Sequence, residues 1–203
     1  GVGGALPSTG TAAMNWPSEV MTARTWNKER FSMRGEILAL EATYSGVTEI
    51  WYGGGNIHRT PFGGRIREYY SEDGNFGYIV GACEASAMQK MGVIYAIKHF
   101  ALNDQESFRS GVSTFSNEQA IREIYLRAFE GAFCEGGALG VMTGFNRIGC
   151  RYNATNPYLL TTVLRGEWGF KGHVTTDGYT ATSTYQNHFA EEVVAGVDYC
   201  CVD

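Results

Sequence analysis

Several features that would assign a function directly are missing from this sequence of 203 residues. The four histidines form no HxH or HExxH motif and the five cysteines form no CxxC pair, so nothing supports a metal site. Lys and Arg number 16 against 21 Asp and Glu, and the net charge of -5 does not favour nucleic acid or an acidic membrane as a partner. No apolar run approaches the roughly 20 residues of a transmembrane helix. We therefore expect no metal, no cofactor, no nucleic-acid partner and no membrane span.

The cysteines bear on the cellular compartment. An odd number without paired spacing favours free thiols over disulfides, and three of them lie in apolar segments, which predicts buried thiols. Unpaired thiols slightly favour the cytoplasm, although bacterial-type secretion stays open because the amino end, starting at Gly1, resembles the inside of a loop. The cysteines are Cys83, Cys134, Cys150, Cys200 and Cys201.

What the sequence does contain is a regular alternation of strand-like and helix-like segments. Apolar residues make up 44% and charged residues 18%, as in globular proteins. Such alternation is typical of an α/β fold with a parallel sheet. We expect about five strands, at 49–52, 93–97, 139–145, 173–176 and 197–202. Helices are expected at 28–43, 76–91, after Ser116, after Asn156 and at 189–195.

The two central helices carry the clearest signals. After Ser116, the segment SNEQ predicts a capping box with Gln119, and a pair of glycines from Gly136 ends the helix. Asn156 can cap the second helix, with Pro157 in its first turn. The inward faces are predicted to hold Ile121, Ile124, Tyr125, Ala128, Phe129, Ala132 and Phe133 in the first helix, and Leu159, Leu160, Val163 and Leu164 in the second. We expect all four tryptophans, Trp16, Trp26, Trp51 and Trp168, to pack against other side chains rather than to form a binding surface.

Polar residues recur where a predicted strand gives way to the next loop. Active sites of (β/α) barrels are built at this edge, so polar groups from four strands are expected to meet there. They are Asn56 with Arg65, Lys98 with His99, Thr143 with Asn146, and Asp177.

Four segments that carry these residues resemble glycoside hydrolase family 3. They are NIHRTPFGGRIREYYSED (56–73), KHFALNDQE (98–106), VMTGFNRIGC (141–150) and NPYLLTTVLRGEWGFKGHVTTDGY (156–179), and they occur in family order. The resemblance extends from about Ser8 to Asp203. It implies a (β/α)8 TIM-barrel-like fold, with residues 1–203 forming a partial barrel domain. Because a complete barrel needs about 250 residues, we expect it to be incomplete at one or both ends.

The resemblance also implies a β-glucosidase-like activity. Asp177 corresponds to the nucleophile of a retaining double displacement that removes terminal non-reducing β-D-glucosyl or related residues from an oligosaccharide or aryl β-glycoside. Arg65, Lys98 and His99 occupy substrate-contact positions, and we expect their positive charge to lower the pKa of Asp177.

Further positions follow from the same resemblance. Met142 is expected to line the non-reducing-end subsite, and Glu106 and Asn103 to support the loop after KHF. Phe145 stands where the family usually has Tyr. Gly178 stands where the family commonly has Trp, which leaves the sugar preference open.

Two expected parts of the mechanism have no counterpart here. The family's D-G-P segment, whose Asp clamps the sugar, is not found. A retaining enzyme also needs a second carboxyl group about 5 to 5.5 Å from the first, and in two-domain relatives it comes from a separate α/β sandwich domain. The KHFALNDQE form differs from the KHFPGHG form of the single-domain branch, where a His serves this role. We therefore expect the isolated chain to be poorly active.

Other interpretations stay open. Asp177 before Gly178 is also typical of a turn, and a surface ion pair with Glu68 or Glu72 is an alternative role for Arg65. The chain as a whole is alternatively a non-catalytic sugar-binding or scaffold remnant of the same barrel, or an unrelated barrel enzyme that uses Lys98 as a Schiff-base amine.

Overall fold

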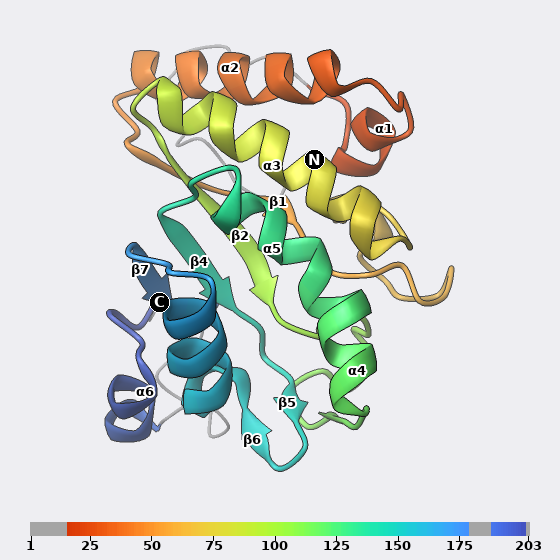
Figure 1. The fold of residues 1–203 in the computed structure, drawn as a ribbon, viewed down its shortest axis with the longest axis vertical. Coiled ribbons are helices and arrows are strands. Elements are labelled where there is room, and N and C mark those ends of the chain that lie inside the picture. Colours follow the sequence, from red (N-terminus) through yellow and green to blue (C-terminus); the bar gives the residue numbers. More distant parts are fainter. Residues whose placement is uncertain (1–15, 179–187, 202–203) are drawn as a thin grey trace.

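A computed structural model describes residues 16–178 and 188–201, which contain a four-stranded parallel sheet. Its strands are β1 (Glu49–Gly54), β2 (Ile94–Phe100), β4 (Gly140–Thr143) and β7 (His173–Thr175), arranged in that order. Strands that follow one another in the sheet also follow one another in the chain, with helices between them (Figure 1). This is the arrangement of successive βα units in a barrel, of which a closed barrel has eight.

The longest helices exceed the strands in length, and α4, η2 and α5 are continuous with one another. They are α1 (Glu19–Ala23), α2 (Lys28–Tyr44), α3 (Gly74–Lys90), α4 (Glu118–Ala120), η2 (Ile121–Leu126), α5 (Arg127–Cys134), η4 (Tyr158–Glu167) and α6 (Phe189–Ala195), with short turns η1 (Ile66–Glu68) and η3 (Asn153–Thr155). Helix α3 packs against α2 on one side and α5 on the other (Figure 1). Helices α3 and α5 also contact β2, so this layer covers the sheet.

The larger of two apolar clusters among the described residues lies between the sheet and this helical layer. Its centre is an aromatic cluster in which the Phe100 ring lies 5.2 Å from Phe129 and 6.1 Å from Phe133, and Phe133 stacks on Trp168. Phe100 ends strand β2, immediately after the polar pair predicted for the site. The core therefore fixes the position of that pair.

The predicted elements are largely confirmed, including a helix at 189–195 with the predicted bounds. The helix after Ser116 differs in detail. Its cap is Asn117, whose side chain accepts the Ala120 N–H at 2.8 Å, so the capping box at Ser116 is wrong. The segment η2 has i to i+5 hydrogen bonds, which widen the helical turn locally, while Ile121 and Tyr125 still pack against the core as predicted. In this turn Leu126 is buried and Ile124 is exposed.

Asn156 does cap the second helix, where it accepts the Leu159 N–H at 3.3 Å, and all four predicted inward residues of this helix are buried. The predicted strand at 197–202 is wrong for the described residues, because only a single bridge joins Tyr199 to Thr175. A small second sheet was not predicted. It consists of β3 (Ser113–Thr114), β5 (Arg147–Ile148) and β6 (Arg151–Tyr152), in loops at the end of the molecule opposite α2 (Figure 1).

Two predictions about side chains are also corrected. All five cysteines are described and form no disulfide, but none is buried, because their segments place them at helix surfaces and in loops. Trp26 does not pack into the core. It is 76% exposed and stacks on Phe76, with ring centroids 4.3 Å apart, because it lies in the turn between α1 and α2.

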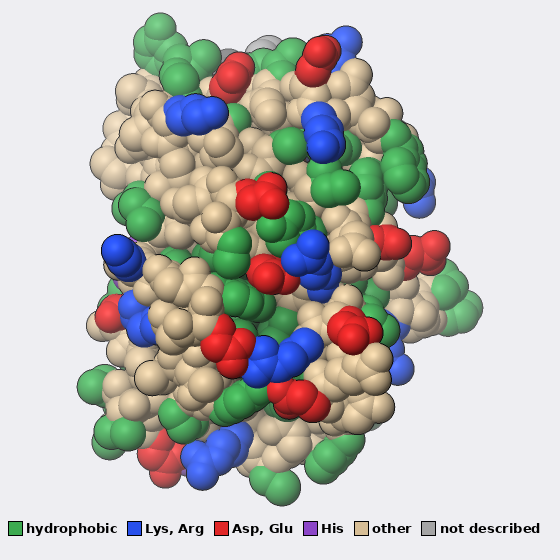
Figure 2. All heavy atoms as spheres, viewed as in Figure 1, with side chains coloured by type: hydrophobic (Ala, Val, Ile, Leu, Met, Phe, Trp, Pro, Cys, Tyr) green, Lys and Arg blue, Asp and Glu red, His purple; other side chains and the backbone are tan. Residues whose placement is uncertain are grey.

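The surface carries both signs of charge. Acidic and basic side chains are interspersed on the face in Figure 2. Within the described ranges, no helix has the length and apolar character needed to span a bilayer.

Candidate active site at the carboxyl ends of the strands

The structure brings three of the predicted site residues into one cluster. Asp177 follows β7, His99 lies near the end of β2, and Arg65 lies in the loop after β1. His99 Nε2 is 3.4 Å from Asp177 Oδ2 and 3.1 Å from Arg65 Nη2. Residues separated by more than 100 positions therefore meet at the sheet edge where barrel sites are built.

Asn56 fixes the backbone of His99. The Asn56 amide accepts the His99 N–H at 2.8 Å and donates to the His99 carbonyl at 3.0 Å. This two-point contact joins the loop after β1 to the end of β2. The polar residues that follow β1 and end β2 therefore lie together at this edge of the sheet.

Arg65 takes part in two kinds of contact. Its Nε donates to Glu68 Oε2 at 2.9 Å, and its Nη1 is 3.7 Å from Glu106 Oε1. The interpretation of Arg65 as an ion-pair partner of Glu68 is therefore correct, and the same side chain still reaches His99. Two carboxylates on one guanidinium restrict its rotation, which keeps it aimed at the site.

The carboxyl of Asp177 is mostly buried, and burial raises its pKa above the usual range. The Gly178 N–H, Arg65, Arg109 and Lys98 act in the opposite direction but do not outweigh burial. The prediction that cations would give a net lowering of this pKa is therefore wrong, because desolvation is the larger effect. Asp177 Oδ1 accepts a hydrogen bond from the Gly178 N–H at 2.8 Å, which is the turn-like contact that an Asp before a Gly predicts.

His99 is fully enclosed, and its pKa lies well below the ordinary value. Burial is the main cause, and the positive charges of Arg65, Lys98 and Arg109 add to it. The imidazole is therefore neutral near pH 7. Lys98, beside it, is also buried.

Arg109 belongs to this cluster, although the sequence analysis missed it. Its Nη1 donates to Glu106 Oε2 at 2.9 Å, and its guanidinium lies 4.4 Å above the Phe145 ring. The spacing of three residues from Glu106 was the available signal. Glu106 contacts both Arg109 and Arg65, which supports its predicted role.

The remaining predicted positions are buried beneath the cluster. Met142 and Phe145 lie in and after β4 with almost no exposed surface, so neither side chain is open to solvent. Asn103 is equally buried, and its amide has no hydrogen-bond partner among the described residues. The side-chain support predicted for Asn103 is thus not seen. Instead, Asn146 and Asn153 bind the Ala101 carbonyl at 3.2 and 2.7 Å and hold the loop after β2.

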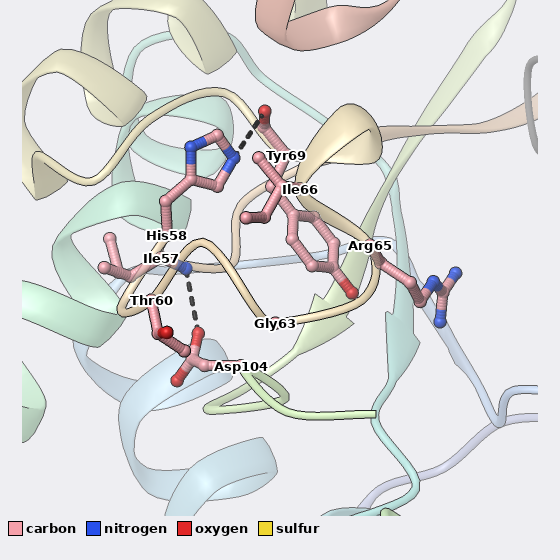
Figure 3. Close-up of a pocket in the computed structure, with 8 residues that line it drawn as sticks. All are labelled: Ile57, His58, Thr60, Gly63, Arg65, Ile66, Tyr69 and Asp104. Carbon is pink, nitrogen blue, oxygen red and sulfur yellow. Dashed lines mark hydrogen bonds between the residues drawn. The ribbon is translucent and has the colours of Figure 1, made fainter. Parts of the chain in front are cut away.

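A small pocket is lined by residues of the loop that carries Arg65 and by Asp104 (Figure 3). Asp104 accepts the Ile57 N–H there at 2.9 Å, and the Tyr69 carbonyl accepts a hydrogen bond from His58 Nε2 at 3.0 Å. Burial raises the pKa of Asp104 to about 6. These contacts fasten the loop at both ends.

Among residues 16–178 and 188–201, no group of three His, Cys, Asp or Glu side chains is placed to hold a metal ion.

Comparison with known proteins identifies the family of the chain. The profile described as the Glycosyl hydrolase family 3 N terminal domain matches residues 2–201. The chain belongs to glycoside hydrolase family 3. Its fold is accordingly an α/β fold of the TIM-barrel type with a mostly parallel sheet.

Individual relatives agree with this. The chain is 38% identical to β-glucosidase B of Emericella nidulans over 198 residues, which are 98% of this chain and 23% of that protein. It superimposes on β-glucosidase 3B of Thermotoga neapolitana in complex with glucose with a TM-score of 0.86 and 38% identity, covering 91% of this chain and 25% of the other. It is also 39% identical over 162 residues to an exo-α-(1→6)-L-arabinopyranosidase of Bifidobacterium breve, covering 80% and 21% of the two chains. The chain thus spans about a quarter of the length of these relatives.

Proposed function

We propose that this chain forms the nucleophile-bearing and sugar-binding part of a retaining β-glycosidase, most simply one that releases terminal β-D-glucosyl residues. The observation that carries the proposal is the cluster of Asp177, His99 and Arg65 at the carboxyl ends of three strands. Membership in the family and the likeness to β-glucosidases support it.

In this proposal Asp177 attacks the anomeric carbon and forms a glycosyl-enzyme ester, while the aglycone oxygen leaves. Water then hydrolyses the ester and releases the sugar with its original configuration. The attacking group must be a carboxylate. Arg65, Lys98 and Arg109 favour that form electrostatically, and they partly offset the effect of burial.

The sugar is held by the same groups. A pyranose beside Asp177 meets the guanidinium of Arg65, the imidazole of His99 and, from the side of β2, Lys98. Charged donors make strong hydrogen bonds to hydroxyl oxygens when they are partly buried, as these are. Their contribution is to orient the ring as it flattens toward the oxocarbenium geometry.

The acid/base carboxyl is proposed to come from a sandwich domain outside these 203 residues. The nearest glutamates of the cluster, Glu68 and Glu106, are each held in an ion pair with an arginine, so neither carboxyl is free to contact a leaving group. The relatives are about four times longer than the matched region, so there is room for such a domain. Because general acid catalysis contributes about 10² to 10⁴ in rate, this chain alone should hydrolyse natural glycosides poorly.

Chemical rescue tests the role of Asp177. An Asp177→Ala variant is incubated with azide and 2,4-dinitrophenyl β-D-glucoside, whose leaving group requires no acid. Azide takes the place of the missing carboxylate, so α-D-glucosyl azide is the expected product. The control is Glu36→Ala, which removes an exposed carboxylate on α2 and should leave the wild-type β-configured product.

The two outcomes separate the candidate functions. If Asp177→Ala with azide gives no inverted product, and the wild-type chain binds glucose without turnover of the dinitrophenyl glucoside, the sugar-binding remnant is the better description. An arabinopyranoside assayed in parallel addresses the sugar preference, since the Bifidobacterium breve relative is named for that sugar.

A further inference from the structure

His99 can hold only one ring proton, and its surroundings determine which nitrogen carries it. The ring is buried and neutral, and the charged side chains acting on it from its own strand and the neighbouring loops are Lys98, Arg65 and Arg109. Glu68 and Glu106 face Arg65 rather than the ring. In a neutral imidazole, one nitrogen donates a hydrogen bond and the other accepts.

The contacts of Nε2 favour its role as acceptor. Arg65 Nη2 lies 3.1 Å away, and a guanidinium can only donate. A proton on Nε2 would point toward these donor hydrogens and a positive charge. The competing partner, Asp177 Oδ2, is farther from Nε2 than Arg65 is, at 3.4 Å, so it competes less well for this nitrogen.

Nδ1 then carries the proton and faces Tyr69. The Tyr69 hydroxyl is 3.3 Å from Nδ1, and the two rings meet edge to face. Tyr69 is itself buried, and its carbonyl accepts the hydrogen bond from His58 Nε2 (Figure 3). Its hydroxyl is therefore a fixed acceptor behind the histidine.

We propose that Tyr69 is a positioning residue, and that Tyr69 and Arg65 together hold His99 in the tautomer with its proton on Nδ1. Arg65 selects the tautomer, and Tyr69 binds the Nδ1 proton and fixes the ring plane. Nε2 is thereby an acceptor. It makes no hydrogen bond to the ionised form of Asp177, so that oxygen is left for the anomeric carbon.

The arrangement of Arg65 and His99 specifies which substituent of a sugar these two side chains accept, a consequence that rests on the proposed function. A sugar hydroxyl that displaces the direct hydrogen bond between Arg65 and His99 donates to Nε2 and accepts from Nη2. A fluorine accepts weakly and cannot donate, and a hydrogen does neither. The pair should therefore reject both replacements at the same sugar position.

The tautomer is measured directly by two-bond ¹H–¹⁵N correlation spectra of the full chain with ¹⁵N-labelled histidine, near pH 7 and without sugar. A His99→Gln variant identifies the signals. The wild type should show a protonated Nδ1 and an unprotonated Nε2 at His99. A protonated Nε2 in the wild type would overturn the proposal without any variant.

Two variants test the two residues. Arg65→Met removes the donor and should shift the ring toward the Nε2-protonated tautomer, whereas Arg67→Met, an exposed arginine two residues away, should not. Tyr69→Phe should abolish the slowly exchanging Nδ1 proton signal, whereas Tyr44→Phe, at a tyrosine that is 85% exposed, should leave it. An unchanged spectrum in either site variant contradicts the role of that residue. The three other histidines report whether each variant is folded.

The result is separable from the proposed function. A chain with the predicted tautomer that forms no covalent adduct with a glycoside retains the inference about His99 and loses the glycosidase mechanism. A chain that forms the adduct but shows a protonated Nε2 retains the glycosidase mechanism and loses the inference about His99.

Discussion

Glu19 offers a quantitative test of how the end of β1 is supported. Its side chain is buried beside the strand end that leads to Arg65, and its Oε1 accepts the Gly53 N–H at 3.2 Å. Its Oε2 has no hydrogen-bond partner among the described residues. Burial, which outweighs the opposing charge of Arg34, raises the pKa of Glu19 from 4.5 to about 8.

The sign of the effect on stability follows from this rise. Between pH 4.5 and about 8 the folded chain keeps a proton that the unfolded chain releases, so the free energy of unfolding falls as the pH rises. At about 1.4 kcal/mol per pKa unit, the full loss is on the order of 5 kcal/mol. A Glu19→Gln variant keeps the acceptor for Gly53 and does not titrate. It should match the wild type near pH 4.5 and be more stable by roughly 3–5 kcal/mol near pH 9.

Urea denaturation at several pH values, followed by circular dichroism, gives the difference between the two proteins. Glu36→Gln, at an exposed position on α2, controls for the general effect of removing a negative charge. A difference between wild type and Glu19→Gln that does not change with pH would refute the reasoning. It would mean that Glu19 is ionised in the folded chain and compensated by Arg34.

Three further predictions concern packing, surface charge and catalysis. Gly131→Ala should lower the free energy of unfolding by about 1–3 kcal/mol in urea titrations, because its added Cβ would lie 2.1 Å from the Tyr78 carbonyl oxygen. Gly81→Ala is the control and should be neutral or stabilising, because the nearest atom to its added Cβ is 3.5 Å away. An equal loss in both would contradict this account of the α3–α5 contact. Arg122→Ala should change the free energy of unfolding by no more than about 1 kcal/mol, since the ion pair of Arg122 with Glu167 at 2.6 Å is exposed to solvent. A larger loss would contradict the weak contribution expected of an exposed ion pair. The rate at which a glycoside labels Asp177 should begin to fall at a higher pH than it would for an aspartate of ordinary pKa, because burial raises the pKa of Asp177. A labelling rate that stays constant down to about pH 4, the ordinary pKa of aspartate, would contradict the effect of burial.

Much of the fold was predictable because each element carries its own local signal. The helix at 189–195 and the inward face at Leu159, Leu160, Val163 and Leu164 follow from apolar periodicity, and the structure confirms them. Polar residues that follow apolar strands pointed to the sheet edge of the site. There the chain topology alone brings Asp177 and His99 together.

The rest depends on contacts between distant segments. The widened turn in η2, where Leu126 is buried instead of Ile124, has no signal in the apolar pattern. The burial of Glu19 requires its approach to Gly53 from another element, and a propensity argument places glutamate on the surface. The pKa of Asp177 was misjudged for the same reason, since the sequence shows the neighbouring cations but not the loss of solvent.

The most direct test of the central claim is covalent trapping of the nucleophile. The chain is incubated with 2,4-dinitrophenyl 2-deoxy-2-fluoro-β-D-glucoside, which forms the glycosyl-enzyme without an acid catalyst and hydrolyses slowly. Mass spectrometry of the digested chain should find one fluoroglucosyl group per molecule, on the peptide that contains Asp177. An adduct on another carboxylate, or none at concentrations where the sugar binds, would contradict the assignment of Asp177.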